Sequence, residues 1–382
     1  MVSKVAVAHD LKSKVKKKTL FISPLPPPFY GSAMSSKQCL EILQADPRFD
    51  VRNIKLNYSK EMSDLGRPNL YKFYGVVAVV RQIRRLIKKF NPEVIYFMPA
   101  TAGNAMFRDA FFLKVVRSLS RATLVLHLRS QFVKEDWAKP FKRSLIKDML
   151  KCNKLIVLGP ELVGDLETSV DREDIYVLAN GIPETLSDEE FAVVKQQRAS
   201  NDRVSLFFLS NMLEFKGWYK VLEACQLLDK AGIAFQCHFV GGWPSESEEQ
   251  KFQRFVDDHH LHDKVVHHGR LLGDEKARIF RQADLFVYPT EYDACPRVVI
   301  EAMEYGLPVI STRVGTIPTL VEDGKTGYIL DQNLPAAIFE RVTQLMDDGL
   351  RLEMGTAGRR RFLEKYTIDQ YREAFVNILN QI

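Results

Sequence analysis

The sequence predicts an α/β protein made of two doubly wound domains, each with a parallel sheet between layers of helices. The chain has 382 residues, which is long enough for two hydrophobic cores. Short apolar runs typical of buried parallel strands alternate with helical patterns, and this alternation occurs in two separate cycles. Two such units in one chain are expected to face each other across a central cleft.

The first cycle covers the N-terminal half. Its strands are predicted at residues 19–23, 94–98, 122–127 and 154–158. Its helices are predicted at residues 33–45, 75–90, 108–120 and 141–152. Because each strand is followed by a helix, the strands are expected to run parallel with helices on both faces.

The second cycle repeats this pattern. Its strands are predicted at residues 204–209, 235–240, 265–267, 285–288 and 308–311. Amphipathic helices are predicted at 218–230 and 297–305, and the chain ends in a helical pattern that begins at Thr367.

Composition bounds the class of protein. A hydrophobic fraction of 46% and a charged fraction of 27% are ordinary for a soluble globular protein. No apolar run reaches the ~18 residues of a transmembrane helix, and the apolar stretch before Asp10 is too short for a signal peptide. Five cysteines without a C-x-x-C pair argue against a disulfide framework. The expected location is a reducing cytoplasm.

Charge is divided unevenly along the chain. Residues 1–182 contain 31 Lys and Arg against 17 Asp and Glu, a net charge of +14, whereas residues 183–382 have a net charge of −8. The basic half is therefore expected to face an anionic membrane surface or a phosphate-bearing acceptor. The basic stretches at 81–89 and 139–147 favour the membrane as strongly as a solvated helix face. No recognisable nucleic-acid motif accompanies the charge, so no nucleic-acid partner is predicted.

The most informative stretch is a strand-to-helix junction that contains two carboxylates. Asp293 lies in the predicted loop and Glu301 lies on the helix that follows. Such loops open at the carboxyl edge of a parallel sheet, where ligands bind. Backbone N–H groups at the helix start suit a phosphate, and Glu301 is within reach of a ribose diol. The pattern predicts a nucleotide-sugar site.

These residues resemble the retaining GT-B glycosyltransferases of family 4. The family signature is a Glu, seven residues, and a second Glu followed by Ala-Met; here it reads Asp293-x7-Glu301-Ala302-Met303. The likeness continues through residues 306–310 and 315–327. One departure is that the first carboxylate is Asp, which is one methylene shorter than Glu.

The resemblance implies the GT-B fold and a set of donor-binding residues. Glu301 would hold the ribose, and Lys216 matches the Lys of the family's Gly-Arg-x4-Lys-Gly, where it would oppose the diphosphate. Asn211 stands where that motif has Arg, so Arg270 or Arg297 would supply the missing cation. The remaining donor-binding residues implied are Gly31, Ser32, Leu271 and Val298.

The resemblance also implies a catalytic set and domain bounds. His127 matches a His that faces the donor sugar, and with Asp293 and Lys216 it forms the predicted catalytic group. Residues 177–183 resemble the stretch that ends the first domain. The domains are therefore expected at 1–182, on the acceptor side, and 183–366, on the nucleotide-sugar side, with the last helix, 367–382, packing back on the first.

Several of these residues also have a structural interpretation. Lys216 could be a surface lysine at a helix start, Gly31 and Ser32 a simple turn, and His127 a hydrogen-bonded core histidine. The histidines between 259 and 268 suggest zinc, but we interpret them as a solvated loop. No Asp-x-Asp pair follows a strand, so no metal site and no cofactor are predicted.

Together with these residues, the resemblance implies a retaining, metal-independent glycosyltransferase that uses a UDP- or GDP-linked sugar and a glycan or lipid-linked acceptor. Surface polysaccharide or glycolipid assembly, in the cytoplasm or on the inner face of the membrane, fits the basic first half. Two alternatives stay open: a nucleotide-sugar epimerase or phosphorylase, and a non-catalytic nucleotide-sugar-binding subunit.

Overall fold

The computed structural model of the chain describes residues 16–27, 31–56, 70–130, 132, 134–152, 154–167, 169–198 and 203–382. These residues pack as two compact units. The first contains residues 1–156, 166–176 and 376–382, and the second contains residues 157–165 and 177–375. The division of the chain into domains at 1–182 and 183–366 stays a prediction.

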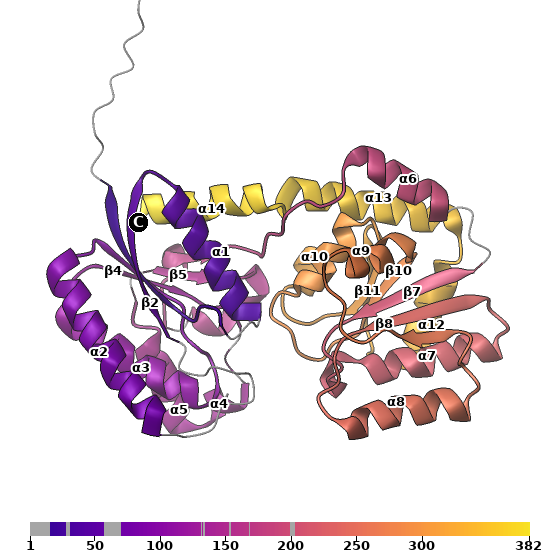
Figure 1. Cartoon of the computed structure of the whole chain (residues 1–382), viewed down its shortest axis with the longest axis horizontal. Helices are drawn as coiled ribbons and strands as arrows, with labels where there is room; N and C mark the ends of the chain where they lie inside the picture. The colour runs from indigo at the N-terminus through magenta and orange to yellow at the C-terminus, as the bar shows by residue number, and fades with distance from the viewer. Residues whose placement is uncertain are drawn as a thin grey trace, which may run out of the picture. The chain divides into compact units, whose positions relative to one another are not determined.

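The first unit contains a six-stranded sheet in the order β2-β1-β3-β4-β5-β6, and every pair with a described register runs parallel. Its strands are β1 (Lys17–Ser23), β2 (Phe49–Lys55), β3 (Val94–Phe97), β4 (Thr123–His127), β5 (Lys154–Val157) and β6 (Ile175–Val177). Its helices are α1 (Gly31–Ala45), α2 (Leu70–Phe90), α3 (Gly103–Leu119), α4 (Lys134–Ala138) and α5 (Pro140–Met149). Helices α2, α3 and α5 lie side by side (Figure 1).

Two strands of this sheet are absent from the sequence prediction. Strand β2 has the sequence FDVRNIK, and only its first and sixth residues are buried, because it lies at the edge of the sheet. Strand β6 has only three residues, at the opposite edge. Edge strands lack the continuous apolar run that marks the central strands.

The second unit contains another six-stranded parallel sheet, in the order β12-β11-β10-β7-β8-β9. Its strands are β7 (Val204–Leu209), β8 (Phe235–Val240), β9 (Val265–His267), β10 (Leu285–Tyr288), β11 (Val309–Thr312) and β12 (Gly327–Leu330). The two sheets with flanking helices confirm the prediction of two Rossmann-like doubly wound units.

The helices of the second unit cover both faces of its sheet (Figure 1). They are α6 (Asp188–Arg198), α7 (Trp218–Lys230), α8 (Glu246–Asp258), α9 (Gly273–Gln282), α10 (Arg297–Glu304), α11 (Ile317–Leu320), α12 (Pro335–Gln344) and α13 (Asp348–Lys365). Short 3₁₀ helices lie at Pro160–Leu162, Gly164–Leu166, Arg172–Asp174 and Glu214–Lys216. None of the described helices combines the length and the apolarity needed to cross a lipid bilayer.

The last helix, α14 (Ile368–Gln381), contributes to both units. Its residues up to Phe375 belong to the second unit, and those from Val376 belong to the first. Within the first unit, Lys17 Nζ donates to the carbonyls of Leu379 and Asn380, at 3.1 and 2.9 Å.

The order of the second sheet creates a topological switch point between β7 and β10. From β7 the chain proceeds outward through β8 and β9, and it then returns to place β10 on the other side of β7. The helices that follow these two neighbouring strands, α7 and α10, therefore lie on opposite faces of the sheet, while the loops that lead to them begin side by side (Figure 1). A crevice at the carboxyl ends of the strands is the usual result, and ligands of doubly wound sheets bind there.

Buried aromatic rings fix this central pair of strands. The rings of Phe207 on β7 and Phe286 on β10 lie 5.7 Å apart in an edge-to-face arrangement, and both side chains are fully buried. Phe280 of α9 contacts Phe207 edge-to-face, with ring centroids 4.9 Å apart. Because apolar strand residues point to both faces of the sheet, the strands form continuous hydrophobic runs in the sequence.

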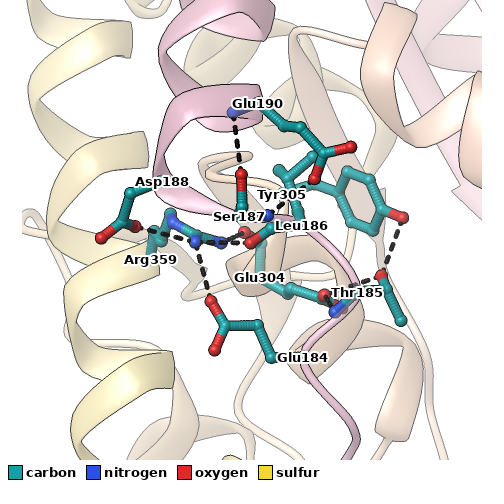
Figure 2. Close-up of polar contacts among 9 residues, drawn as sticks. All are labelled: Glu184, Thr185, Leu186, Ser187, Asp188, Glu190, Glu304, Tyr305 and Arg359. Atoms are coloured by element: carbon teal, nitrogen blue, oxygen red, sulfur yellow. Dashed lines mark hydrogen bonds and ion pairs between the residues drawn. The ribbon is translucent and has the colours of Figure 1, made fainter.

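A buried arginine fastens the entry of the second unit to α10. Arg359 on α13 has a side chain only 3% exposed, and its Nη1 donates to the carbonyl of Glu304 at 2.9 Å (Figure 2). Its Nη2 donates to the carbonyl of Leu186 at 2.7 Å and to the carboxylates of Glu184 and Asp188, both at 3.0 Å. One guanidinium thus joins the segment before α6 to the end of α10.

The same segment makes a second contact with α10 (Figure 2). The Thr185 hydroxyl donates to Glu304 at 2.8 Å, and the Thr185 backbone N–H donates to the same carboxylate oxygen. Burial raises the pKa of Glu304, and these two donors oppose that rise. Helix α10 is thereby held at its C-terminal end, one turn after Glu301.

Replacing Arg359 tests this anchor. We expect Arg359→Ala to lower the free energy of unfolding by about 2–3 kcal/mol, because two buried carbonyls lose charge-assisted donors. Arg360→Ala removes the same side chain from the exposed neighbouring position and should change stability by less than about 0.5 kcal/mol. Urea unfolding followed by circular dichroism makes the comparison; equal effects of the two substitutions would contradict the role of Arg359.

Candidate functional site

The switch point of the second unit brings a lysine and a carboxylate together. Lys216 ends the 3₁₀ helix after β7, and Asp293 lies in the loop after β10. Lys216 Nζ donates to Asp293 Oδ2 at 2.7 Å and to the Tyr292 carbonyl at 3.0 Å. The two side chains are 14% and 21% exposed, so the pair is accessible at the carboxyl edge of the sheet.

A tyrosine at the end of β10 is the third member of this group. The Tyr288 hydroxyl donates to the same Asp293 Oδ2 at 2.9 Å. Burial, and then the charge of Asp293, raises the pKa of Tyr288, so its hydroxyl stays protonated and remains a donor. Asp293 is therefore held by one cation and one neutral donor.

Glycine at position 217 allows the two loops to approach each other. Gly217 has φ of 86°, and a Cβ placed there would lie 2.3 Å from the carbonyl oxygen of Pro289. Any side chain would thus force the loop after β7 away from the loop after β10. The Lys-Gly dipeptide joins a charged side chain to the residue that permits this contact.

The Asp293 loop is fixed at two further points. The carbonyl oxygen of Asp293 would lie 2.1 Å from a Cβ at Gly315, which has φ of 53°, and Thr316 N–H donates to the Ala294 carbonyl at 2.9 Å. Asn180 Nδ2 donates to the Cys295 carbonyl at 2.8 Å. Together with Gly217, residues from three distant parts of the sequence therefore set the position of the Asp293 loop.

The second carboxylate of the signature also holds a lysine. Glu301 lies on α10, which follows the Asp293 loop, and its Oε2 accepts from Lys276 Nζ of α9 at 2.9 Å. Glu301 is 20% exposed and Lys276 is 28% exposed. No side chain caps the start of α10, where Pro296 is the N-cap residue. The backbone N–H groups there point toward the same edge as the carboxylates, which favours an anion.

The other predicted donor residues of the second unit lie around this edge. Asn211 is exposed just after β7, and exposed Arg270 with half-buried Leu271 lies in the loop between β9 and α9. Arg297 and Val298 are half-buried first residues of α10. Every predicted residue of this unit therefore follows a strand of the same sheet at its carboxyl end.

His127 belongs to the first unit. It ends β4, is fully buried, and its Nδ1 lies 2.5 Å from the Tyr96 hydroxyl. Its Nε2 lies 3.4 Å from Arg129 Nη1. Burial, assisted by the charge of Arg129, lowers the pKa of His127 well below its usual value, so the imidazole is neutral near pH 7.

Gly31 and Ser32 also belong to the first unit, but their setting differs from the prediction. The sequence places them in the loop before a helix at 33–45, whereas α1 begins at Gly31 itself. The Ser32 carbonyl accepts from the Ser36 hydroxyl at 2.9 Å, as a residue of the first helical turn. Residues 28–30, which precede them, lie outside the described part.

The histidine-rich stretch is partly packed rather than wholly solvated. His267 Nε2 lies 2.9 Å from the Gly241 carbonyl, and its ring packs against Trp243 with centroids 4.9 Å apart. His268 Nε2 lies 2.9 Å from His238 Nδ1. Among the described residues, no group of three His, Cys, Asp or Glu side chains is placed to hold a metal ion.

Sequence reasoning missed two partners of the candidate site, Lys276 and Tyr288. Lys276 is 25 positions before Glu301, on a helix that carries no motif, so only the packing of α9 beside α10 reveals it. In the sequence Tyr288 belongs to an apolar strand, and its position directly before the Asp293 loop is the signal that could have drawn attention to its hydroxyl.

Comparison with known proteins points to a class for this chain. Residues 189–361 match the model of a family described as Glycosyl transferases group 1. That segment contains Lys216, Lys276, Asp293 and Glu301. Together with the two Rossmann-like units, the match supports a glycosyltransferase with the GT-B fold.

Two named relatives are similar over most of the chain, and a third over 37% of it. The putative colanic acid biosynthesis glycosyltransferase WcaL of Escherichia coli (strain K12) is 28% identical over 321 residues, which cover 78% of this chain and 75% of that protein. The match to WcaL of Salmonella typhimurium covers 36% of that protein. The capsular polysaccharide biosynthesis glycosyltransferase CapM of Staphylococcus aureus is 21% identical, over 76% of this chain and 86% of CapM.

A solved structure agrees with the fold. The Anabaena protein HepE, solved in complex with UDP-glucose, superimposes with a TM-score of 0.70 at 15% identity, over 96% of this chain and 100% of that one. The comparisons do not favour an epimerase or a non-catalytic subunit.

The depressed pKa of His127 predicts a pH-dependent stability. The folded state keeps the imidazole neutral, whereas the unfolded state binds a proton below pH ~6.5. The contribution of His127 to the free energy of unfolding is therefore fully present above pH ~6.5 and is lost as the pH falls. The loss approaches about 1.4 kcal/mol per pH unit. We therefore expect His127→Gln to flatten the fall in unfolding free energy between pH 7 and pH 5.5.

Urea unfolding at the two pH values measures this slope. His262→Gln, at a position with a 56% exposed side chain, is the matched control and should leave the slope as in wild type. Burial also lowers the pKa of His238, to about 4, but that contribution is common to all three proteins and cancels. A slope unchanged by His127→Gln would contradict the prediction.

Proposed function

We propose that this chain is a retaining glycosyltransferase that moves a sugar from a nucleotide diphosphate sugar, UDP- or GDP-linked, to a glycan or lipid-linked acceptor. The observation that carries the proposal is the pair of lysine–carboxylate contacts, Lys216–Asp293 and Lys276–Glu301, at the switch point of the second sheet. Two cations, two carboxylates and a helix start at one edge match the parts of a sugar nucleotide: diphosphate, sugar hydroxyls and ribose.

Lys216 is proposed to stabilise the leaving group. When the bond between the sugar C1 and the diphosphate oxygen breaks, the electron pair stays with the phosphate, and its negative charge grows. A lysine ammonium together with the N–H groups at the start of α10 would oppose that charge without a metal ion. Lys216 Nζ is held by Asp293 and the Tyr292 carbonyl, which take two of its three N–H donors, so the third can donate to a phosphate.

The carboxylates are proposed to hold hydroxyl groups. Glu301 can accept from both hydroxyls of a ribose, and Asp293 can accept from the transferred sugar while keeping its bond to Tyr288. The proposed role of His127 rests on the family resemblance alone, since its ring is fully buried in the first unit and its two nitrogens lie beside Tyr96 and Arg129. Arg270, Leu271, Arg297, Val298 and Asn211 complete the proposed donor contacts of the second unit; Gly31 and Ser32 of the first unit are proposed from the resemblance alone.

We place this activity in the assembly of surface polysaccharide or glycolipid, on the cytoplasmic side of the membrane. WcaL and CapM are named for colanic acid and capsular polysaccharide biosynthesis, and HepE was solved with UDP-glucose. Product analysis with a panel of UDP- and GDP-linked sugars tests the proposal. A product that retains the anomeric configuration of the donor is expected; conversion of the donor to its epimer would overturn it.

Lys216→Ala should reduce transferase kcat/KM by about 10- to 100-fold, because a charge-assisted contact to a phosphate contributes about 1.5–3 kcal/mol. Lys220→Ala provides the control. Lys220 lies one turn after Lys216, and its Nζ donates to Glu291, in the loop that carries Asp293, at 2.5 Å. It has no proposed role in donor binding. Its loss should change the rate by less than about threefold. Turnover of Lys216→Ala within twofold of wild type would remove Lys216 from the mechanism.

Glu301→Gln should weaken nucleotide binding by about 10-fold or more while the thermal unfolding temperature stays close to that of wild type, since the amide keeps the shape and loses the charged acceptor. Calorimetric titration with UDP and GDP measures the change. Glu275→Gln, an exposed position on α9, is the matched control. If both variants bind nucleotide as wild type does, Glu301 has only a structural role.

Activity should survive chelation. If Lys216 and backbone dipoles alone oppose the charge of the leaving group, initial rates in excess EDTA should stay within about twofold of those in buffer. Rates that collapse in EDTA and recover with magnesium or manganese would show that a divalent ion takes part.

A further inference from the structure

Two phenylalanines of the first unit are exposed next to each other. Phe141, at the start of α5, is 72% exposed, and Phe107 of α3 is 37% exposed. Their rings are stacked, with centroids 6.2 Å apart and planes inclined by 20°. Phe111, one turn further along α3, is 48% exposed. Single exposed apolar residues are common, but a contiguous aromatic group indicates a surface that docks on something apolar.

Basic side chains lie beside Phe141. Phe141 borders an open hollow of about 630 Å³, whose lining includes Lys114 of α3, Arg143 and Lys147 of α5, and Lys151. Helices α3 and α5 lie side by side (Figure 1), and both contribute to the lining of this hollow. We call Phe107, Phe141, Lys114, Arg143, Lys147 and Lys151 the aromatic–basic patch.

The positive charge of the patch is only partly neutralised. Asp148 is the one acidic residue among those that line the hollow, and it contacts Lys151 at 3.4 Å and Lys114 at 3.7 Å. Arg143 and Lys147 are exposed, and neither forms an ion pair with another described residue. Lys142 belongs to the same basic stretch, 139–147, but unlike Arg143 and Lys147 it forms an ion pair, with Asp136 at 2.6 Å.

We propose that the aromatic–basic patch docks on an anionic phospholipid bilayer, with Phe107 and Phe141 in the interface and Arg143 and Lys147 beside the lipid phosphates. Aromatic side chains among lysines and arginines suit a surface that is anionic outside and apolar a few ångströms deeper. Nucleic acid could use the cations, but no recognisable nucleic-acid motif accompanies them in the sequence. The excess charge of +14 in residues 1–182 favours the same partner.

Vesicle binding by the full chain tests the charges. Co-sedimentation in 0.15 M salt should show binding to vesicles of phosphatidylcholine with phosphatidylglycerol and much weaker binding to phosphatidylcholine alone. Arg143→Glu with Lys147→Glu should weaken binding to the anionic vesicles at least about tenfold, since each cation near the surface contributes about fivefold. Lys230→Glu with Arg254→Glu makes the same change in net charge on exposed positions of the second unit, and should stay within about twofold of wild type.

A tryptophan reporter tests the aromatic part. Phe141→Trp should show a blue-shifted emission, after subtraction of the wild-type spectrum, when anionic vesicles are added, and brominated acyl chains should quench it. Equal binding to neutral vesicles, undiminished binding of the Arg143/Lys147 variant, or an unshifted emission of the Phe141→Trp variant would each overturn the proposal. Donor hydrolysis without lipid should be equal in all variants, which separates this test from that of the transferase activity.

Discussion

The close contact between Gly217 and Pro289 is the constraint on which the candidate site depends. Strands β7 and β10 are neighbours in the sheet, but their loops can meet only because residue 217 has no side chain to strike the Pro289 carbonyl. That contact places Lys216 against Asp293. Gly315 and Asn180 then fix the far side of the same loop. The charged pair is therefore a product of backbone packing, and the strength of the ion pair itself is secondary.

The anchor at the other end of the site has a different physical basis. Helix α10 carries Glu301, and its last turn is tied to the segment before α6 by Arg359 and Thr185 (Figure 2). Here buried hydrogen bonds fix the position, whereas at Gly217 close backbone contact does so. No side chain caps the N-terminus of α10, where Pro296 is the N-cap residue, so the side-chain hydrogen bonds that position this helix lie at its other end.

Much of this arrangement can be predicted from sequence, since nine of the strands form apolar runs. The missed ones are β2 and β6 at the edges of their sheet, and β12, whose four residues begin with Gly327 and form the edge of the other. The residues of the second-unit site are predictable because they follow strands. Lys276 is not, because its relation to Glu301 arises from the packing of α9 beside α10 and leaves no mark in the local sequence. The helix start at Gly31 is missed for a local reason: glycine favours turns, so a helix that begins on one has no start signal there.

The two lysine–carboxylate contacts have a consequence for the entropy of binding. A free lysine side chain samples many rotamers, and fixing it on a ligand costs up to about 2 kcal/mol. In this protein Lys216 and Lys276 are each held by a carboxylate, at 2.7 and 2.9 Å, before any ligand is present. Their freedom is lost when the chain folds, so that a ligand entering this edge meets side chains that are already ordered.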